Sequence, residues 1–89
     1  MTKKEEKSDW FVYILECKDK TLYAGITNNM EKRLEQHNNG QEGAKYTRAR
    51  RPVKCVYKEK QPNRSEATKR EMAIKKLSRN EKLKLIALY

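Results

Sequence analysis

The chain has 89 residues, with 22 Lys or Arg against 12 Asp or Glu, so its formal net charge is +10 at pH 7. A chain of this length forms one domain with a modest core, and we expect that domain over residues 10–89, behind a disordered tail at residues 1–9. No apolar run is long enough for a transmembrane helix and no signal-peptide core is present, so the sequence argues against a membrane protein and favours the cytoplasm.

The positive charge is concentrated in the second half of the chain. Residues 1–40 carry seven basic and seven acidic side chains, whereas residues 41–64 carry eight and two, and residues 65–89 carry seven and three. A basic face of this kind attracts polyanions. We therefore expect a nucleic acid as the partner, rather than a membrane, because no predicted helix pairs a continuous basic face with a bulky apolar one. A surface that serves only solubility, or a basic tail, is the alternative.

The chain begins with two predicted strands. Residues 10–15 form a continuous aromatic, β-branched and aliphatic run, which is typical of a strand covered on both faces. A turn at residues 18–20 leads into a second strand over residues 21–26. Folding this hairpin at its turn places Tyr13 roughly opposite Tyr23.

A helix is predicted next, over residues 27–37. Thr27 or Asn28 can cap its start, and Glu31 follows Asn28 by three residues, as in a variant of the capping box. Residues 38–40 are Asn-Asn-Gly, which tolerate the positive φ that often ends a helix.

The second half adds a loop, a strand and two helices. Residues 41–52 read as a basic loop and residues 53–58 as a strand. A helix over residues 65–77 begins at a capping serine, and a last helix over residues 78–89 begins with a Ser-x-x-Glu capping box. The order β-β-α-β-α-α predicts an α/β (α+β) fold, with a small, three-stranded, mostly antiparallel sheet flanked by helices.

The cysteines do not suggest a metal site or a disulfide. Cys17 and Cys55 lie far apart in apolar stretches, and the chain has one histidine, so no zinc-ligand set is present. Buried free thiols in a reducing compartment are the prediction.

Polar side chains fall on the apolar stripe of the first predicted helix. Met30 and Leu34 define that stripe, and His37 lies about 20° from Met30 when each residue turns the helix by about 100°. Arg33 sits at the edge of the stripe, on the same face as His37. Simple exposure of both side chains is the alternative.

A carboxylate lies on the inner stripe of the next helix, where Glu71 falls about 40° from Ala67. A carboxylate on an apolar face is costly unless it pairs or binds a cation. A salt bridge to one of the lysines is the alternative. For Tyr13 and Tyr23, the alternative is a core position with the hydroxyl at the rim.

These residue types together suit the hydrolysis of a phosphodiester. That reaction needs a water nucleophile, a base, positive charge on the phosphoryl oxygens and help for the leaving oxygen. Arginine binds phosphate as a fork, and a carboxylate can hold Mg²⁺ that keeps most of its waters. A tyrosine pKa near 10 is unfavourable for a base, so a cation or a metal-bound water would have to assist it.

The same residues resemble the motifs of the GIY-YIG nuclease superfamily. Residues 11–13 (Phe-Val-Tyr) and 23–25 (Tyr-Ala-Gly) match its two strand motifs, and Arg33, His37 and Glu71 match its helix positions. The resemblance extends over most of the domain, and within the superfamily the chain is similar to the small stand-alone bacterial branch. That branch is in turn similar to the nuclease domains of excision repair and of enzymes that cut branched DNA.

This resemblance implies a metal-dependent endonuclease that hydrolyses phosphodiester bonds in DNA, including branched or single-stranded forms. It implies that Tyr13 or Tyr23 deprotonates or orients the water. Arg33 would hold the scissile phosphate and His37 would assist proton transfer. Glu71 would hold one divalent metal, Mg²⁺ or another such as Mn²⁺, on the leaving side.

The resemblance also implies a DNA-binding loop and a close approach near the site. Gly25 would permit the close backbone approach. The loop residues are Lys45, Tyr46, Arg48, Arg50 and Arg51. Tyr46 could stack on an unpaired base. A solvated basic turn is the alternative for this loop.

Two other functions remain open at this point. The first is a binding module of the same fold that cuts weakly or not at all. The second is a basic adaptor for other proteins. DNA is favoured over RNA as the partner, and either the basic face itself or a protein partner would select the target.

Overall fold

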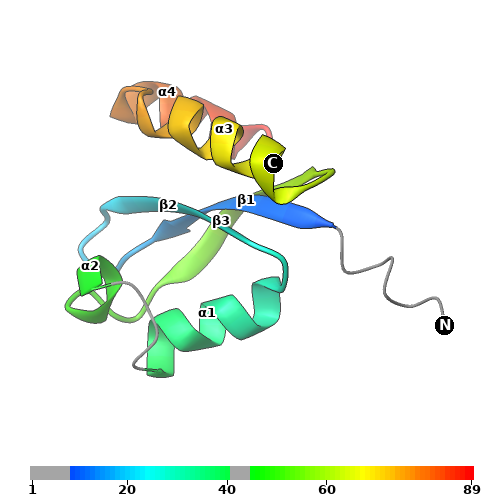
Figure 1. Cartoon of the computed structure of the whole chain (residues 1–89). Helices are drawn as coiled ribbons and strands as arrows, with labels where there is room; N and C mark the ends of the chain where they lie inside the picture. The colour runs from blue at the N-terminus through cyan, green and yellow to red at the C-terminus, as the bar shows by residue number, and fades with distance from the viewer. Residues whose placement is uncertain (1–8, 41–44) are drawn as a thin grey trace, which may run out of the picture.

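The computed structural model describes residues 9–40 and 45–89, so the predicted tail lies outside the described residues except for Asp9. The elements run in the order β1 (Trp10–Glu16), β2 (Leu22–Thr27), α1 (Met30–Asn39), α2 (Lys45–Arg48), β3 (Lys54–Gln61), α3 (Arg64–Lys75) and α4 (Arg79–Ala87) (Figure 1). The predicted α+β order is confirmed, and α2 adds a single helical turn within the segment predicted as a basic loop. Along the described residues, no helix has the length and apolar character that a membrane span requires.

The sheet has the order β2-β1-β3, and both pairs of neighbours are antiparallel. Because β1 is central, its residues are covered on both faces, and residues 12–15 are all buried. This explains why β1 is a continuous apolar run rather than an alternating one. β3 continues to Gln61, three residues beyond the predicted strand, because it pairs along β1 as far as Trp10.

The hairpin register differs from the prediction by two residues. Tyr13 lies opposite Gly25, and Tyr23 lies opposite Leu15. Side chains alternate between the two faces of a strand, so a shift of two residues leaves both tyrosines on the same face of the sheet.

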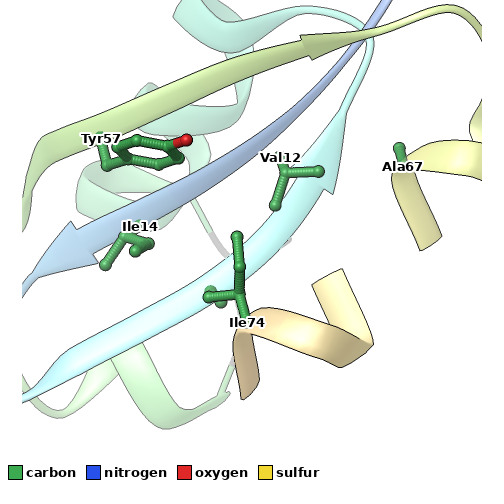
Figure 2. Close-up of a cluster of buried hydrophobic side chains, with 6 residues drawn as sticks. Val12, Ile14, Tyr57, Ala67 and Ile74 are labelled. Atoms are coloured by element: carbon green, nitrogen blue, oxygen red, sulfur yellow. The ribbon is translucent and has the colours of Figure 1, made fainter. Parts of the chain in front are cut away.

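Helices cover both faces of the sheet, with α3 and α4 on one side and α1 and α2 on the other (Figure 1). Figure 2 shows the core beneath α3, where Val12, Ile14 and Tyr57 of the sheet lie against Ala67 and Ile74. A second cluster lies on the opposite face. It contains Tyr13, Leu15, Cys17 and Val53, with Tyr23, Met30, Leu34 and Cys55 packed against it. The candidate functional residues of α1 belong to this second face.

The cap of α1 lies one residue later than predicted. Asn29 is the N-cap, and its side chain accepts a hydrogen bond from the backbone N–H of Lys32. Thr27 serves the turn before it, since its hydroxyl accepts from the N–H of Asn29. Thr27 and Asn28 were therefore wrong as caps, because three successive short polar residues offer the same chemistry and only packing selects among them.

One of the two later caps was predicted correctly. Asn63, not Ser65, caps α3, and its side chain accepts from the N–H of Glu66. Ser78 and Glu81 form the predicted capping box of α4. Both helix starts therefore rest on local side chains of the kind that sequence reasoning can detect.

Both cysteines are free thiols, as predicted, with Cys17 buried and Cys55 half-buried. Burial is the largest effect on each thiol, and it raises the pKa of Cys17 and of Cys55. Thiols that stay protonated are poor nucleophiles and poor metal ligands.

Candidate active site

A buried chain of hydrogen bonds joins β1, α1 and α2 on the second face of the sheet. The hydroxyl oxygen of Tyr13 lies 2.9 Å from Nε2 of His37, and Nδ1 of His37 lies 2.7 Å from the hydroxyl oxygen of Thr47. Nε of Arg33 donates to the Tyr13 hydroxyl over 3.4 Å. Tyr13 is 1% exposed, and His37 and Thr47 are fully buried.

Gly25 makes room for the ring of Tyr13. The two residues are paired across β1 and β2. A Cβ atom at position 25 would lie 2.5 Å from the Tyr13 hydroxyl oxygen and 2.7 Å from Cζ, both well inside van der Waals contact. The close approach expected at Gly25 is therefore made by the tyrosine side chain lying over the glycine.

Helix α1 presents Arg33 and His37 one turn apart, as the stripe argument predicted. His37 is the buried residue of the helix, whereas Arg33 is half-buried. Nη1 of Arg33 donates to the side-chain oxygen of Gln36 over 3.0 Å, so the guanidinium is held from within its own helix. The predicted alternative of two flexible exposed side chains does not describe this helix.

The direction of the hydrogen bonds follows from the chemistry of arginine. A guanidinium donates only, so the Tyr13 oxygen accepts from Arg33. The Tyr13 proton needs an acceptor, and among the described residues Nε2 of His37 lies within reach. Nε2 then carries no proton, so Nδ1 carries it and donates to Thr47.

His37 is neutral in this arrangement. Burial, followed by the positive charges of Arg33 and Arg51, lowers the pKa of His37 from 6.5 to about 4. Both effects disfavour the imidazolium. The neutral ring accepts from Tyr13 on one side and donates to Thr47 on the other.

Tyr13 holds its proton in the free protein. Burial raises the pKa of Tyr13 above the usual 10.0, and the charges of Tyr23 and Glu71 reinforce the increase, while the hydrogen bond and charge of Arg33 oppose it. A further cation near the hydroxyl would be needed to lower this pKa.

Glu71 lies on α3, across the sheet from α1, and its charge acts on Tyr13. Its side chain is 18% exposed, and one carboxylate oxygen lies 3.2 Å from Nζ of Lys75. The salt bridge considered as an alternative is therefore present. Because Lys75 is 54% exposed, its ammonium can move into solvent and leave the carboxylate to another cation.

The donor set suits a metal that takes few protein ligands. No group of three or more His, Cys, Asp or Glu side chains that could hold a metal occurs in the described part of the chain. A single recessed carboxylate is chemically compatible with Mg²⁺, which keeps several waters and commonly takes one or two carboxylates together with substrate phosphate oxygens.

The predicted loop residues divide into three groups. Lys45 and Arg48 are exposed on α2. Tyr46 stacks on Tyr23, with ring centroids 5.8 Å apart, and the Arg50 guanidinium lies over the Tyr46 ring.

Arg51 turns inward from this loop. Its guanidinium donates to the backbone oxygens of Gln36, His37 and Gly40. These are carbonyls of the last turn of α1 and of the residue after it, where a cation also matches the negative end of the helix dipole. Arg51 thus holds the helix that carries Arg33.

Thr47 is the site residue that sequence reasoning missed. It lies between Tyr46 and Arg48 in a segment that reads as a basic loop, yet its side chain is fully buried against His37. The only local signal is a β-branched hydroxyl residue within a basic stretch, which is too common to identify a partner for a histidine ten residues away.

A depression of about 200 Å³ opens beside Arg33. Its lining is polar and comes from the start of α1 and the turn before it. The residues are Thr27, Asn28, Asn29, Lys32, Arg33 and Gln36. Space of this size next to a guanidinium can admit a phosphate group.

Known proteins resemble this chain over nearly its whole length. The family model of the GIY-YIG catalytic domain matches residues 9–84. A UPF0213 protein from Syntrophus aciditrophicus (strain SB) is 62% identical over 76 residues, which cover 85% of this chain and 87% of that protein. A UPF0213 protein from Clostridium perfringens is 62% identical over 77 residues, which cover 86% and 82%.

Two solution NMR structures have a similar fold. A UPF0213 protein from Bacillus halodurans gives a TM-score of 0.58 at 41% identity, with 90% of this chain and 84% of that chain covered. A protein from E. faecalis gives a TM-score of 0.61 at 41% identity, with 94% and 90% covered.

Proposed function

This chain belongs to the GIY-YIG catalytic domain family, as its motif residues indicated, and we propose that it is a metal-dependent endonuclease that hydrolyses phosphodiester bonds in DNA. The observation that carries the proposal is the set formed by buried Tyr13 and His37 with half-buried Arg33, in which a phenol contacts both a neutral imidazole and a guanidinium. A core with no catalytic task rarely contains a buried phenol and a buried imidazole beside a guanidinium.

Arg33 is proposed to bind the scissile phosphate in the depression beside it. A guanidinium keeps its charge at any physiological pH, and it can stabilise the charge that develops on the phosphoryl oxygens. Gln36 fixes its direction, because it accepts from Nη1. Lys32, which lines the same depression, adds positive charge.

Tyr13 is proposed to take a proton from the attacking water while it passes its own proton to Nε2 of His37. The hydrogen bond to His37 already points in that direction. Burial is the largest cause of the lowered pKa of His37, and the charges of Arg33 and Arg51 add to it. Phosphate bound at Arg33 would offset that added positive charge, which makes the imidazole a better acceptor in the complex than in the free protein. Thr47 accepts the hydrogen bond from Nδ1–H of His37 throughout this transfer.

Tyr23 is proposed to have a different task. Its ring lies edge-on to His37 at 5.4 Å and stacks on Tyr46. These contacts use the ring rather than the hydroxyl, so we assign Tyr23 to shaping the site and Tyr13 to moving the proton.

Glu71 is proposed to hold the divalent metal, Mg²⁺ or another such as Mn²⁺, together with water and substrate oxygens. When bound, the metal supplies positive charge on the leaving side of the phosphate. Lys75 would release the carboxylate, and its exposed position permits this.

The proposed substrate is DNA rather than RNA, in branched or single-stranded form, with the cytoplasm as the location. Lys45 and Arg48 project from α2, close in sequence to Thr47 and Tyr46 of the site, and give the backbone of the nucleic acid two cations. Phosphate contacts of this kind position a substrate without reading its sequence, so a protein partner is the proposed source of target choice.

A second candidate function is a nucleic-acid-binding module of the same fold that cuts weakly or not at all. The resting state favours it, because Glu71 is paired with Lys75 and the pKa shifts keep Tyr13 protonated and His37 neutral. The two candidates predict the same binding and differ in the effect of metal.

The deciding experiment is a cleavage assay on labelled duplex, single-stranded, flap and four-way-junction DNA, with and without Mg²⁺. Glu71→Gln is compared with Glu66→Gln, a change on the same helix at another lysine-paired glutamate. We expect cleavage of one DNA form that requires metal, is lost in Glu71→Gln and persists in Glu66→Gln. Binding of Mn²⁺ is measured in parallel by electron paramagnetic resonance, and we expect it to weaken in Glu71→Gln alone. Cleavage that is equal in both variants would identify a contaminant.

A further inference from the structure

A ladder of flat groups leads from the buried site to the surface. The ring of Tyr23 contacts His37 at 5.4 Å and stacks on Tyr46 at 5.8 Å, with 21° between the two tyrosine planes. Cζ of Arg50 lies 3.9 Å from the centre of the Tyr46 ring. Tyr46 is 38% exposed, so the ladder emerges at the surface there.

The planar, positively charged guanidinium of Arg50 covers the ring of Tyr46. Its Nη1 donates to the backbone oxygen of Tyr46 over 3.0 Å, and its Nε lies 3.1 Å from a carboxylate oxygen of Asp19 in the hairpin turn. A guanidinium stacked in this way covers an area of the ring that a nucleobase also covers when it stacks.

The contact that holds Arg50 is one that a polyanion can break. Asp19 is exposed, and its carboxylate also accepts hydrogen bonds from the hydroxyl and the N–H of Thr21. The bond from the Thr21 hydroxyl is the largest cause of the lowered pKa of Asp19. Asp19 therefore has other donors when Arg50 leaves. Exposed ion pairs are weak and screened by salt, whereas a phosphate offers a guanidinium a bidentate contact.

We propose that Tyr46 is a stacking platform for one unpaired DNA base, and that Arg50 covers it until a phosphate draws the guanidinium away from Asp19. The proposal rests on the proposed function, since it names the substrate form that this same site accepts. Bases inside a duplex are stacked on each other and cannot reach the ring, so the platform selects single strands, flaps or nucleotides at a junction. Arg50 then contributes to the backbone contact after it leaves the ring.

A purely structural role for these residues is the competing explanation. In that case Arg50 and Tyr46 tie the β1–β2 turn to α2, and replacing Tyr46 changes stability but not the choice of nucleic acid. The two explanations separate in a binding experiment that reports directly on one base.

The probe is a short thymine oligonucleotide with a single central 2-aminopurine, whose fluorescence falls when the base stacks. Binding is measured in EDTA, so that no cleavage is required, and a duplex of the same length is measured beside it. The proteins are the wild type, Tyr46→Phe, Tyr46→Leu, Asp19→Asn and Glu66→Gln, and each is first checked for a cooperative thermal transition. Asparagine at position 19 keeps the acceptor for Thr21 while it loses the charge that holds Arg50.

We expect quenching in the wild type and in Tyr46→Phe. Tyr46→Leu should lose the quenching and bind the single strand roughly tenfold more weakly, with little change for the duplex. Asp19→Asn should raise single-strand affinity roughly twofold or more and should increase quenching. Glu66→Gln makes the same change of charge on α3, which lies across the sheet from α2 (Figure 1), and should raise both affinities alike without altering the quenching.

Equal quenching in Tyr46→Leu and the wild type would overturn the proposal, and so would a wild type that binds single strands without quenching. These results are separate from the cleavage assay. Stacking without cleavage would leave the platform intact and remove the nuclease, whereas cleavage without stacking would do the reverse.

Discussion

The hydroxyl oxygen of Tyr13 lies 2.9 Å from Nε2 of His37, and neither residue is more than 1% exposed. The two residues are 24 positions apart and come from a strand and a helix, so the tertiary fold alone brings them together. Arg33 donates to the same oxygen, which fixes the phenol proton on the imidazole side.

Tyr13→Phe should abolish metal-dependent cleavage, whereas Tyr23→Phe should retain most of it. The first change removes the hydroxyl that links Arg33 to His37, and the second keeps the ring contacts through which Tyr23 acts. Loss of a proton-transferring group lowers rates by about 10²–10⁴-fold. Single-turnover cleavage rates measure the difference, and equal losses in the two variants would contradict the division of roles.

The stability of the protein should fall as pH drops from about 6.5 to about 4. The pKa of His37 is lowered in the folded state, so over this window the unfolded chain binds a proton that the folded protein does not. The loss should approach roughly 3 kcal/mol once the pH reaches the folded-state value. Urea unfolding at pH 7, 6 and 5 measures it. His37 is the only histidine, so His37→Asn serves as the control and should show a much flatter dependence between pH 7 and 5.

Thr47 should set the tautomer of His37. Thr47→Val keeps the shape of the side chain and removes the acceptor for Nδ1–H, whereas Thr47→Ser keeps the acceptor. We expect ¹⁵N NMR to show the proton on Nδ1 in the wild type and in Thr47→Ser, and a shift towards Nε2–H in Thr47→Val. Leaving a buried donor without a partner costs about 1–3 kcal/mol, so Thr47→Val should also be less stable than Thr47→Ser. An unchanged tautomer in Thr47→Val would assign Thr47 to packing alone.

Sequence reasoning recovered the fold because its signals were local. The apolar run of β1 and the Ser78–Glu81 capping box each involve residues that lie only a few positions apart. The register of the hairpin was two residues off, because turn length fixes it and the turn residues do not specify that length tightly.

The site was predicted in part, for a physical reason. The helical period located His37 and Glu71 on their inner faces, and the structure describes them as buried and half-buried. Periodicity cannot say which polar group meets which, so the Thr47 partner and the inward turn of Arg51 emerged only from the tertiary contacts. The Arg50 and Asp19 pair spans 31 positions and has no local signal.

Gly25→Ala should destabilise the protein through its contact with Tyr13. The added methyl group would lie 2.5 Å from the hydroxyl oxygen and 2.7 Å from Cζ, so the ring or the strand must shift. Crowding of this kind costs about 1–3 kcal/mol. A double-mutant cycle with Tyr13→Ala checks the cause, because the penalty at position 25 should largely disappear once the ring is gone. The same penalty in both backgrounds would mean that the strand itself requires glycine.

Arg51→Ala and Arg48→Ala should differ in kind although both remove a cation from one loop. Arg51 donates to backbone oxygens at the end of α1. Partly buried hydrogen bonds to a charged group contribute about 1.5–3 kcal/mol each. Arg51→Ala should therefore lower the free energy of unfolding by several kcal/mol at most. Arg48 is exposed, so Arg48→Ala should leave stability nearly unchanged while it weakens DNA binding and reduces the salt dependence of that binding. Urea unfolding and binding at several salt concentrations separate the two effects. If Arg48→Ala unfolds more readily than Arg51→Ala, the inward contacts of Arg51 do not stabilise α1. Arg51 would then be assigned to DNA binding, together with Lys45 and Arg48.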